Sequence, residues 1–241
     1  MKNTPLYLYG KHAALAALAN PMRKIKRVMV TKNTAAECAR ELASVKNISV
    51  VDGGKIDHLL PKDAVHQGII AECEPLSQPS LQDFLQQPAT NNQQPILLLD
   101  QVSDPHNVGA ILRSAAAFGI GAVVTLERGA AQESGTLAKS ASGALEIVPL
   151  ISVSNLAQAI ELLKKDGYWV YGLDGEAKQT IGQVKFDAKT ALILGAEGRG
   201  LRRLTAERCD MLVKIPMSGQ MESLNVSNAA AVAMYEIFRK K

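Results

Sequence analysis

One junction between a strand and a helix limits the folds open to this chain more than any other feature. An apolar run of strand length at residues 96–99 is followed by the polar turn 104–107 and then by a small-residue helix over 110–118. A strand that ends in a turn and leads into a helix is the repeating unit of parallel α/β sheets, which bind ligands at the carboxyl ends of their strands. Asn107 and Arg113 stand at this junction, where an amide and a guanidinium can bind sugar or phosphate oxygens.

Patterns of the same kind recur and divide the chain into two α/β parts. Residues 1–74 form a small unit, and residues 96–241 form a longer one. Residues 75–95 between them carry four prolines, six glutamines and two asparagines, which is typical of a linker. The expected strands are 28–30, 48–51, 68–71, 96–99, 122–126, 169–173, 191–194 and 212–215, and the expected helices are 12–18, 35–45 (capped by Thr34), 108–118, 135–141, 156–165, 201–208 and 224–239.

The composition is that of an ordinary globular protein, with 241 residues of which 47% are hydrophobic and 21% charged. No apolar run approaches the roughly 20 residues of a membrane span, and the first residues lack the apolar stretch of a secretory signal. Cys38, Cys73 and Cys209 are scattered and form no CxxC pair, which argues against a disulfide framework and against a metal site. We therefore expect a cytoplasmic protein with buried, reduced thiols and no membrane contact.

The positive charge gathers in clusters. The net charge of +4 permits a nucleic-acid partner without requiring one. No acidic residue interrupts the two main clusters, which favours phosphate contact over a plain solvated surface. The first cluster is Arg23, Lys24, Lys26 and Arg27, and the second is Arg199, Arg202 and Arg203.

A second candidate site segment follows the apolar run at 191–194. Gly195, Gly198 and Gly200 come directly after it, and glycines allow the backbone to approach a ligand closely. Their spacing is GxxGxG and not GxGxxG, and no acidic residue ends a strand about 20 residues later, so a dinucleotide fingerprint is not matched. A purely structural glycine turn stays open as the alternative.

A third segment, residues 215–227, runs from a strand through a Pro/Gly loop into the last helix. Ser223 could simply be a helix cap, without any role in a site. Asn225 and Ser227, just inside the expected helix, are unfavourable there by some tenths of a kcal/mol. That cost indicates a role for the Asn225 amide.

In this order and spacing, the three segments resemble the three signature motifs of the SpoU (TrmH-type) RNA ribose methyltransferases, a branch of the SPOUT superfamily. The resemblance covers residues 96–241. Residues 9–12 and 65–69 also resemble the family's amino-terminal substrate-binding domain, which is similar to ribosomal protein L30. The implied fold is a carboxy-terminal α/β trefoil-knot methyltransferase domain behind a small L30-like α/β RNA-binding domain.

The resemblance implies S-adenosylmethionine-dependent methylation of a ribose 2′-hydroxyl, with a guanosine of 23S ribosomal RNA as the expected target. It also implies a homodimer with the site near the subunit interface, and no metal. The implied catalytic residues are Asn107, Arg113, Glu197, Ser223 and Asn225. Gly195, Ile215 and Leu224 fall where the family binds the cofactor, and Gly198 and Met217 complete the expected set. RNA capture is expected from Arg23, Lys24, Lys26 and Arg27.

A plain general-base role for Arg113 conflicts with its chemistry, because a guanidinium stays protonated throughout the physiological pH range and has no free lone pair to accept a proton. We expect Arg113 to bind the adjacent RNA phosphate and to stabilise the developing alkoxide. Asn107, Glu197 and Asn225 would then position the ribose and Arg113, with Glu197 able to pair with the guanidinium. His106 is a possible base, although a turn residue between proline and asparagine is the favoured interpretation.

Three alternatives remain at this stage. The substrate could be transfer RNA or another ribosomal RNA site. The chain could also be a knotted RNA-binding protein without catalysis, although intact motif residues argue against it. A nicotinamide-dependent oxidoreductase is disfavoured by the glycine spacing.

Overall fold

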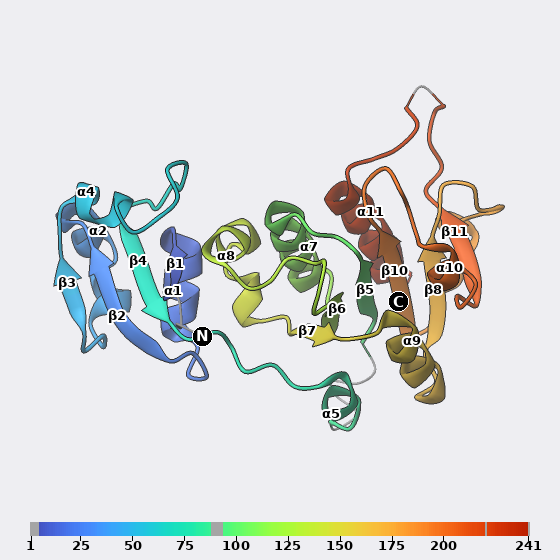
Figure 1. Cartoon of the computed structure of the whole chain (residues 1–241), viewed down its shortest axis with the longest axis horizontal. Coiled ribbons are helices and arrows are strands. Elements are labelled where there is room, and N and C mark those ends of the chain that lie inside the picture. Colours follow the sequence, from blue (N-terminus) through green and yellow to red (C-terminus); the bar gives the residue numbers. More distant parts are fainter. Residues whose placement is uncertain (1–4, 88–93, 220, 241) are drawn as a thin grey trace.

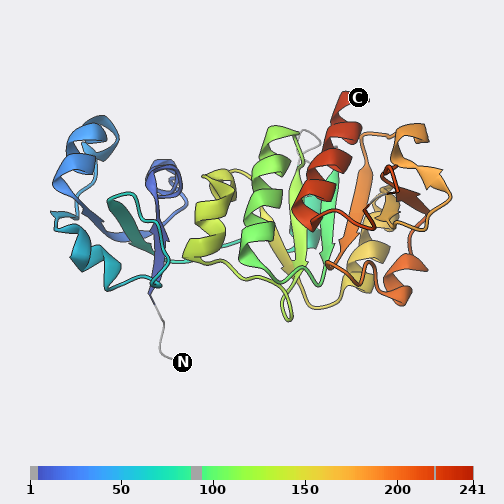
Figure 2. The same cartoon turned by 90° about the horizontal axis from the view of Figure 1, so that it is seen from above.

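The computed structural model describes residues 5–87, 94–219 and 221–240, which form two sheets arranged side by side. The small amino-terminal sheet lies at the left of Figure 1 and the larger sheet at the right, and Figure 2 shows the same elongated arrangement from above. Residues 88–93 of the expected linker lie outside the described part. Within the described ranges, no helix has the length and apolar character needed to cross a membrane.

The amino-terminal sheet has the strand order β1-β4-β2-β3. The central strand β4 runs antiparallel to β1 and β2, and β2 runs parallel to β3. Because of these directions, β1 and β2 end at the edge of the sheet where β4 begins. The elements are β1 (Leu6–Tyr9), α1 (Lys11–Ala19), β2 (Ile25–Val30), α2 (Lys32–Glu37), α3 (Ala39–Leu42), β3 (Ile48–Val50), α4 (Gly53–Asp57) and β4 (Ile69–Cys73).

The helix expected over 35–45 is wrong in its start and in its continuity. The hydroxyl of Thr31 caps α2 by accepting from the Thr34 N–H, so the helix begins three residues earlier. Thr34 is buried, and its own hydroxyl donates to the carbonyl of Gln67. The helix then breaks at Cys38, whose backbone φ of −108° is not helical, and α3 follows.

The larger sheet has the order β7-β6-β5-β10-β8-β11-β9, and all its pairings are parallel. Leu97 and Leu99 of β5 pack in the same core as α7 and α11, whereas Ile96 and Leu98 pack in the core that includes α5 and α9. Helices therefore cover both faces, as a fully parallel sheet requires. The strands are β5 (Ile96–Asp100), β6 (Ala122–Leu126), β7 (Leu150–Val153), β8 (Trp169–Leu173), β9 (Gln179–Thr180), β10 (Thr190–Gly195) and β11 (Met211–Lys214), and the helices are α5 (Leu81–Leu85), α7 (Pro105–Ala117), α8 (Gly135–Ala141), α9 (Leu156–Lys165), α10 (Arg203–Ala206) and α11 (Val226–Arg239).

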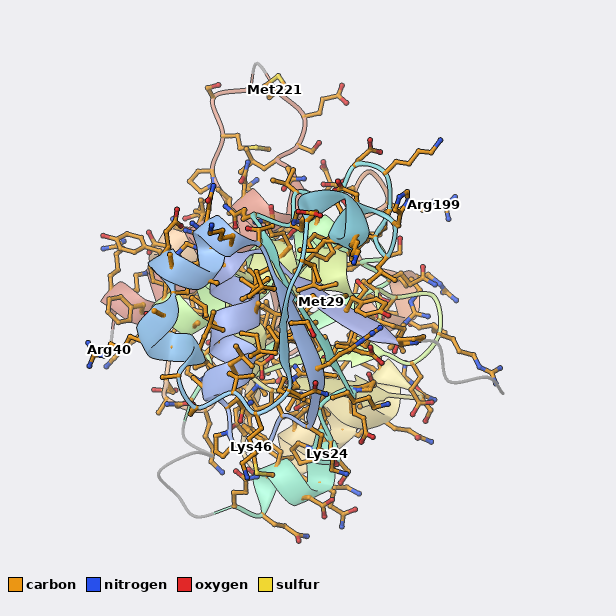
Figure 3. All side chains as sticks on the ribbon, turned by 90° about the vertical axis from the view of Figure 1, so that its left-hand side faces the viewer. Lys24, Met29, Arg40, Lys46, Arg199 and Met221 are labelled. Carbon is orange, nitrogen blue, oxygen red and sulfur yellow. The ribbon has the colours of Figure 1, made fainter. Side chains whose placement is uncertain are left out.

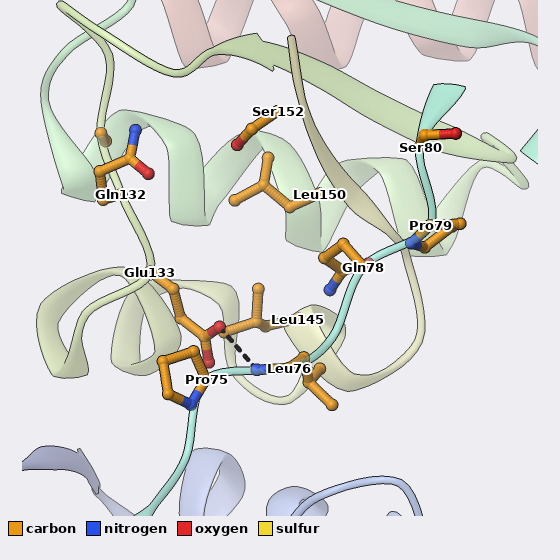
Figure 4. Close-up of a pocket in the computed structure, with 11 residues that line it drawn as sticks. Pro75, Leu76, Gln78, Pro79, Ser80, Gln132, Glu133, Leu145, Leu150 and Ser152 are labelled. Carbon is orange, nitrogen blue, oxygen red and sulfur yellow. Dashed lines mark hydrogen bonds between the residues drawn. The ribbon is translucent and has the colours of Figure 1, made fainter. Parts of the chain in front are cut away.

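The expected linker is packed against the larger sheet. Leu81, Phe84 and Leu85 of α5 are buried in the core beneath β5. A cavity of about 410 Å³ lies between the start of this segment and β7, and residues from both elements line it (Figure 4). The segment therefore connects the two sheets and also covers apolar surface of the second.

A buried arginine joins the two domains. The Arg23 side chain is fully buried and pairs with Glu133 and Glu146 of the larger domain, both at 2.5 Å. The other oxygen of Glu133 accepts the backbone N–H of Leu76, as Figure 4 shows. The prediction that Arg23 contacts RNA is therefore wrong, because its guanidinium has no exposed surface.

Candidate active site

Three loops meet at the carboxyl edge of the larger sheet. They follow β5, β10 and β11, and the parallel register places Gly195 of β10 beside Asp100 of β5. The chain leaves β5 through α7 toward β6 on one side, while β10 flanks β5 on the other side. Such a reversal in strand order opens a crevice in which α/β sheets bind ligands. Figure 1 shows the loop after β11 extending beyond this edge.

Three side chains form a shared hydrogen-bonded triangle: Glu197 from the loop after β10, Asn225 from the end of the loop after β11, and Asn107 from the first turn of α7. The Asn225 amide nitrogen donates to Asn107 Oδ1 at 3.0 Å and to Glu197 Oε1 at 2.5 Å. The Asn107 amide nitrogen donates to the same Glu197 oxygen at 3.3 Å. The structure thus brings together three predicted site residues that are as many as 118 positions apart in the chain.

Helix capping fixes two corners of the triangle. Asp104 caps α7 by accepting the His106 N–H at 2.9 Å, and Pro105 occupies the first turn. Asn225 is itself the cap of α11, since its side-chain oxygen Oδ1 accepts the N–H groups of Ser227 and Asn228. The last helix therefore begins at Val226, two residues later than the expected start at 224, and Ser223 is not the cap.

A cavity of about 330 Å³ borders the triangle. The loops after β8, β10 and β11 enclose it, and Glu197 belongs to its wall as well as to the triangle. All the residues expected to bind the cofactor line this cavity, together with Ser223: they are Gly195, Gly198, Ile215, Met217 and Leu224.

The glycines of the second segment are required by the backbone. A Cβ on Gly195 would lie 2.0 Å from the carbonyl carbon and oxygen of Gly200, which is far inside contact distance. Gly198 and Gly200 have φ values of +73° and +64°, in the left-handed region that glycine favours. The segment therefore folds back on itself, with the Gly200 N–H bonded to the Ala196 carbonyl at 3.0 Å.

Protein-family models match almost the whole chain. The SpoU rRNA Methylase family matches residues 94–235, and a model described as RNA 2′-O ribose methyltransferase substrate binding matches residues 7–79. The chain belongs to the SpoU rRNA methylase family. The resemblance inferred from the three motifs is therefore confirmed.

Curated relatives in this family match over nearly their full length. The 23S rRNA (guanosine-2′-O-)-methyltransferase RlmB of Escherichia coli (strain K12) is 40% identical, covering 97% of this chain and 98% of RlmB. The putative TrmH family tRNA/rRNA methyltransferase YacO of Bacillus subtilis (strain 168) is 36% identical, covering 98% of this chain and 96% of YacO.

Solved SpoU structures share the fold. The SpoU methyltransferase AviRb from Streptomyces viridochromogenes superposes with a TM-score of 0.82 at 22% identity, covering 98% of this chain and 90% of AviRb. An AdoMet-bound rRNA methyltransferase from Sinorhizobium meliloti gives 0.81 at 21% identity, covering 99% and 88%. The expected α/β methyltransferase fold with an amino-terminal substrate-binding domain is confirmed.

Arg113, the remaining catalytic candidate of the first SpoU motif, stands apart from the triangle. Six residues of helix turn the chain by about 600° and advance it by roughly 9 Å, which places Arg113 on another side of α7 from Asn107. It is exposed, and its side chain forms no hydrogen bond or ion pair with any described residue. The expected pairing with Glu197 is absent within one chain.

Two features of this SpoU site escaped the sequence reasoning. The loop after β8 lines the cavity with Asp174, Gly175 and Glu176. The sequence contains a signal for this loop, because the expected strand 169–173 ends in a Leu-Asp-Gly run, which is typical of a turn after a strand. Asp100 is 1% exposed and accepts from Arg202 Nε at 2.6 Å and from the Thr205 hydroxyl at 2.7 Å. It thereby ties the loop after β10 to the end of β5.

These contacts also change the interpretation of the basic clusters. Arg202 is committed to Asp100, and Arg203 pairs with Glu207 at 3.3 Å, so Arg199 alone of the second cluster lacks an acidic partner among the described residues. In the first cluster, Arg27 pairs with Glu72, and Lys24 and Lys26 lie 3.5 and 3.9 Å from Glu74. In Figure 3, which looks along the long axis, Lys24 lies near the bottom of the view and Met221 of the third motif loop lies at the top.

Proposed function

We propose that this protein methylates the 2′-hydroxyl of a guanosine ribose in 23S ribosomal RNA, with S-adenosylmethionine as the methyl donor. The triangle of Asn107, Glu197 and Asn225 beside one cavity is the observation that carries the proposal. Membership of the SpoU family and 40% identity to RlmB support the reaction and the substrate. The rRNA substrate favours a cytoplasmic location.

The cavity fits the proposed cofactor by its charge and by its backbone. Asp174, Glu176, Glu197 and Glu222 line it against one guanidinium, that of Arg199, so its wall is acidic. An acidic wall suits a cationic sulfonium. Bound S-adenosylmethionine would supply an electrophilic methyl group. The close backbone turn at Gly195 leaves main-chain groups at the cavity for hydrogen bonds to the cofactor.

The chain's own residues would align the weakly acidic hydroxyl. Glu197 Oε1 accepts three N–H donors, from Asn107, Asn225 and Val226. Its Oε2 has no hydrogen bond to a described residue, so it can accept one from the ribose. Arg113 remains protonated and would bind the neighbouring phosphate, where its charge stabilises the developing alkoxide. Ser223, on the cavity wall, would contact the same region.

A second copy of the chain would complete the assembly. Val232, Tyr235 and Phe238 of α11 are 41%, 50% and 50% exposed. The rings of Tyr235 and Phe238 each lie 5.9 Å from that of Phe118 at the end of α7. We propose that a homodimer covers this apolar face, since exposed patches of this kind mark interfaces. The same contact would bring α7, with the unpartnered Arg113, against the second chain.

The amino-terminal domain, residues 1–74, would hold the RNA while residues 96–241 carry the catalysis. Of the first basic cluster, the exposed Lys24, Lys26 and Arg27 remain proposed RNA contacts. Their acidic neighbours weaken each of them as a phosphate ligand.

The test is methyl transfer from labelled S-adenosylmethionine to separated 23S, 16S and transfer RNA, followed by mapping of the modified nucleotide. The proposal expects one 2′-O-methylguanosine in 23S RNA. Methylation of transfer RNA alone would replace the substrate, and cofactor binding without transfer to any RNA would contradict an enzymatic role. Cells lacking the protein should lose the same modification.

A further inference from the structure

The boundary between the two domains holds a lysine that pairs with none of the acidic side chains the structure describes. Helix α8 lies between α7 and the amino-terminal domain (Figure 1), and Lys139 stands on it. Its ammonium donates to Gln67 Oε1 across the boundary at 2.6 Å. It also lies so close to Gly10 that a Cβ there would be 2.4 Å from Nζ. Lys139 forms no ion pair with the described residues.

Lys139 is connected to the active site through a short series of contacts. The next residue, Ser140, has its hydroxyl 3.2 Å from Nδ1 of His106, which precedes Asn107 of the triangle. Close packing holds the two helices together, because a Cβ on Gly109 would lie 2.5 Å from the Leu137 carbonyl oxygen. The position of Lys139 relative to the triangle is therefore fixed by packing.

On its other side Lys139 adjoins the edge of the amino-terminal sheet where β1 and β2 end. Gln67 Oε1 also accepts the backbone N–H of Lys11 at 3.1 Å, just after β1. Lys32, just after β2, is exposed and has no ion pair within the described ranges. Lys24, Lys26 and Arg27 lie at the opposite end of β2, each near a glutamate.

Burial makes this site favour an anion. Loss of hydration lowers the pKa of Lys139 below its ordinary value, and no carboxylate offsets that loss. A half-buried ammonium bonded to one neutral amide gains more from a phosphate than a fully hydrated or ion-paired lysine does. The first basic cluster is a weaker candidate for phosphate binding, because its exposed members already lie near glutamates.

We propose that Lys139 is a positioning residue that binds a backbone phosphate of the RNA where the strand crosses from the amino-terminal domain to the catalytic triangle. This inference rests on the proposed function, because it assumes an RNA substrate that reaches both domains. The contact would fix the distance along the RNA between the phosphate held by Lys139 and the ribose that is methylated.

The test compares Lys139→Gln with Lys165→Gln, using a 23S RNA fragment at several salt concentrations. Lys165 is an exposed lysine on α9 without an ion pair among the described residues, so it is a matched control. Lys139→Gln should raise KM for RNA about fivefold to tenfold and reduce the salt slope of binding by about one. Its affinity for S-adenosylmethionine should not change. Equal RNA affinity and equal salt slopes in the two variants would overturn the proposal.

A second variant separates phosphate binding from a merely structural bond. Gln67→Glu would give Lys139 an acidic partner and keep the cross-domain contact. The proposal expects weaker RNA binding than in Gln158→Glu, which adds the same charge on exposed α9. If the bond between Lys139 and Gln67 were only structural, Gln67→Glu and Gln158→Glu would bind RNA equally well, and equal binding would contradict the proposal. Transfer to RNA by the unmodified protein tests the proposed function independently.

Discussion

At the scale of single residues, Asn225 shows how one side chain serves both fold and site. Its side-chain oxygen Oδ1 caps α11, and its side-chain amide nitrogen donates to Asn107 and Glu197. The expectation that Asn225 lies just inside the helix, at a cost in helix propensity, is wrong, and a catalytic role for its amide stays a proposal. The residue precedes the helix, where asparagine is favoured.

These two roles of Asn225 can be separated by substitution. Asn225→Ser keeps a capping oxygen, so the free energy of unfolding should stay within about 0.5 kcal/mol of the original, whereas Asn225→Ala should cost about 1 kcal/mol. Both variants lose the amide donor, and both should lose at least roughly tenfold in methyl transfer. Urea unfolding and initial rates measure the two effects. Full turnover in Asn225→Ser would remove the triangle from the mechanism.

Arg113 is expected to act on the RNA and not on the cofactor, because it lies outside the cavity that would hold the methyl donor. Arg113→Ala should abolish methyl transfer while calorimetric binding of S-adenosylmethionine survives. Arg40→Ala, which removes another exposed arginine, is the control. Turnover retained in Arg113→Ala would exclude this residue from the chemistry.

The thiols give a prediction about pH. Burial raises the pKa of Cys73 to about 11 and that of Cys209 to about 12, well above the ordinary range of a free thiol. Both folded-state values exceed the unfolded value, so the stability due to the neutral thiols is complete below about pH 9 and is lost as the pH rises toward 11 and 12. In a Cys38→Ser variant, which leaves only these two thiols, thiolate absorbance during an alkaline titration should therefore rise late in the folded protein. Ionisation near pH 9 without unfolding would contradict this burial.

At the scale of elements, the sequence predicts the central parts of strands and helices better than their ends. The strand 169–173 and the helix 135–141 agree with β8 and α8. The helix expected over 201–208 is shortened to Arg203–Ala206, because Asp100 holds Arg202 in the preceding loop. Asp100 lies at the end of another strand, so this contact depends on tertiary structure that local propensity does not contain.

The turn at Gly195 is the element most sensitive to added volume. In Gly195→Ala the new methyl group would overlap the Gly200 carbonyl, and the loop that borders the cavity must move. We expect a stability loss of about 1–3 kcal/mol and loss of S-adenosylmethionine binding, measured by calorimetry. Gly182→Ala is the matched control, since its nearest contact would be Thr180 Oγ1 at 3.9 Å. Normal cofactor binding by Gly195→Ala would place the cofactor elsewhere.

At the scale of the whole molecule, the motifs predicted that distant loops meet, but they did not predict how the domains join. Arg23 was assigned to RNA because no acidic residue is near it in sequence, yet Glu133 and Glu146 lie more than 100 positions away. Charge patterns along a chain do not show partners of that kind. The trefoil knot implied by the family resemblance stays a prediction.

The buried arginine leads to a prediction about how the two domains work together. Arg23→Met would leave Glu133 and Glu146 largely buried without their cation, and removal of one partner from such a group costs about 3–5 kcal/mol. Because Glu133 also holds the Leu76 N–H, the connection between the domains should loosen. We therefore expect a lower unfolding midpoint and a larger radius of gyration by small-angle X-ray scattering. KM for RNA should rise while S-adenosylmethionine affinity, which depends on a cavity in one domain, changes little.

A triple variant keeps this prediction testable if Arg23→Met folds poorly. Arg23→Met combined with Glu133→Gln and Glu146→Gln removes the uncompensated charge, so it should recover much of the lost stability. It should not recover the RNA KM, because the two ion pairs that Arg23 forms across the domain boundary are still missing. Recovery of both stability and RNA KM would mean that the cluster only stabilises the fold, and that the alignment of the RNA-binding domain with the catalytic loops has another origin.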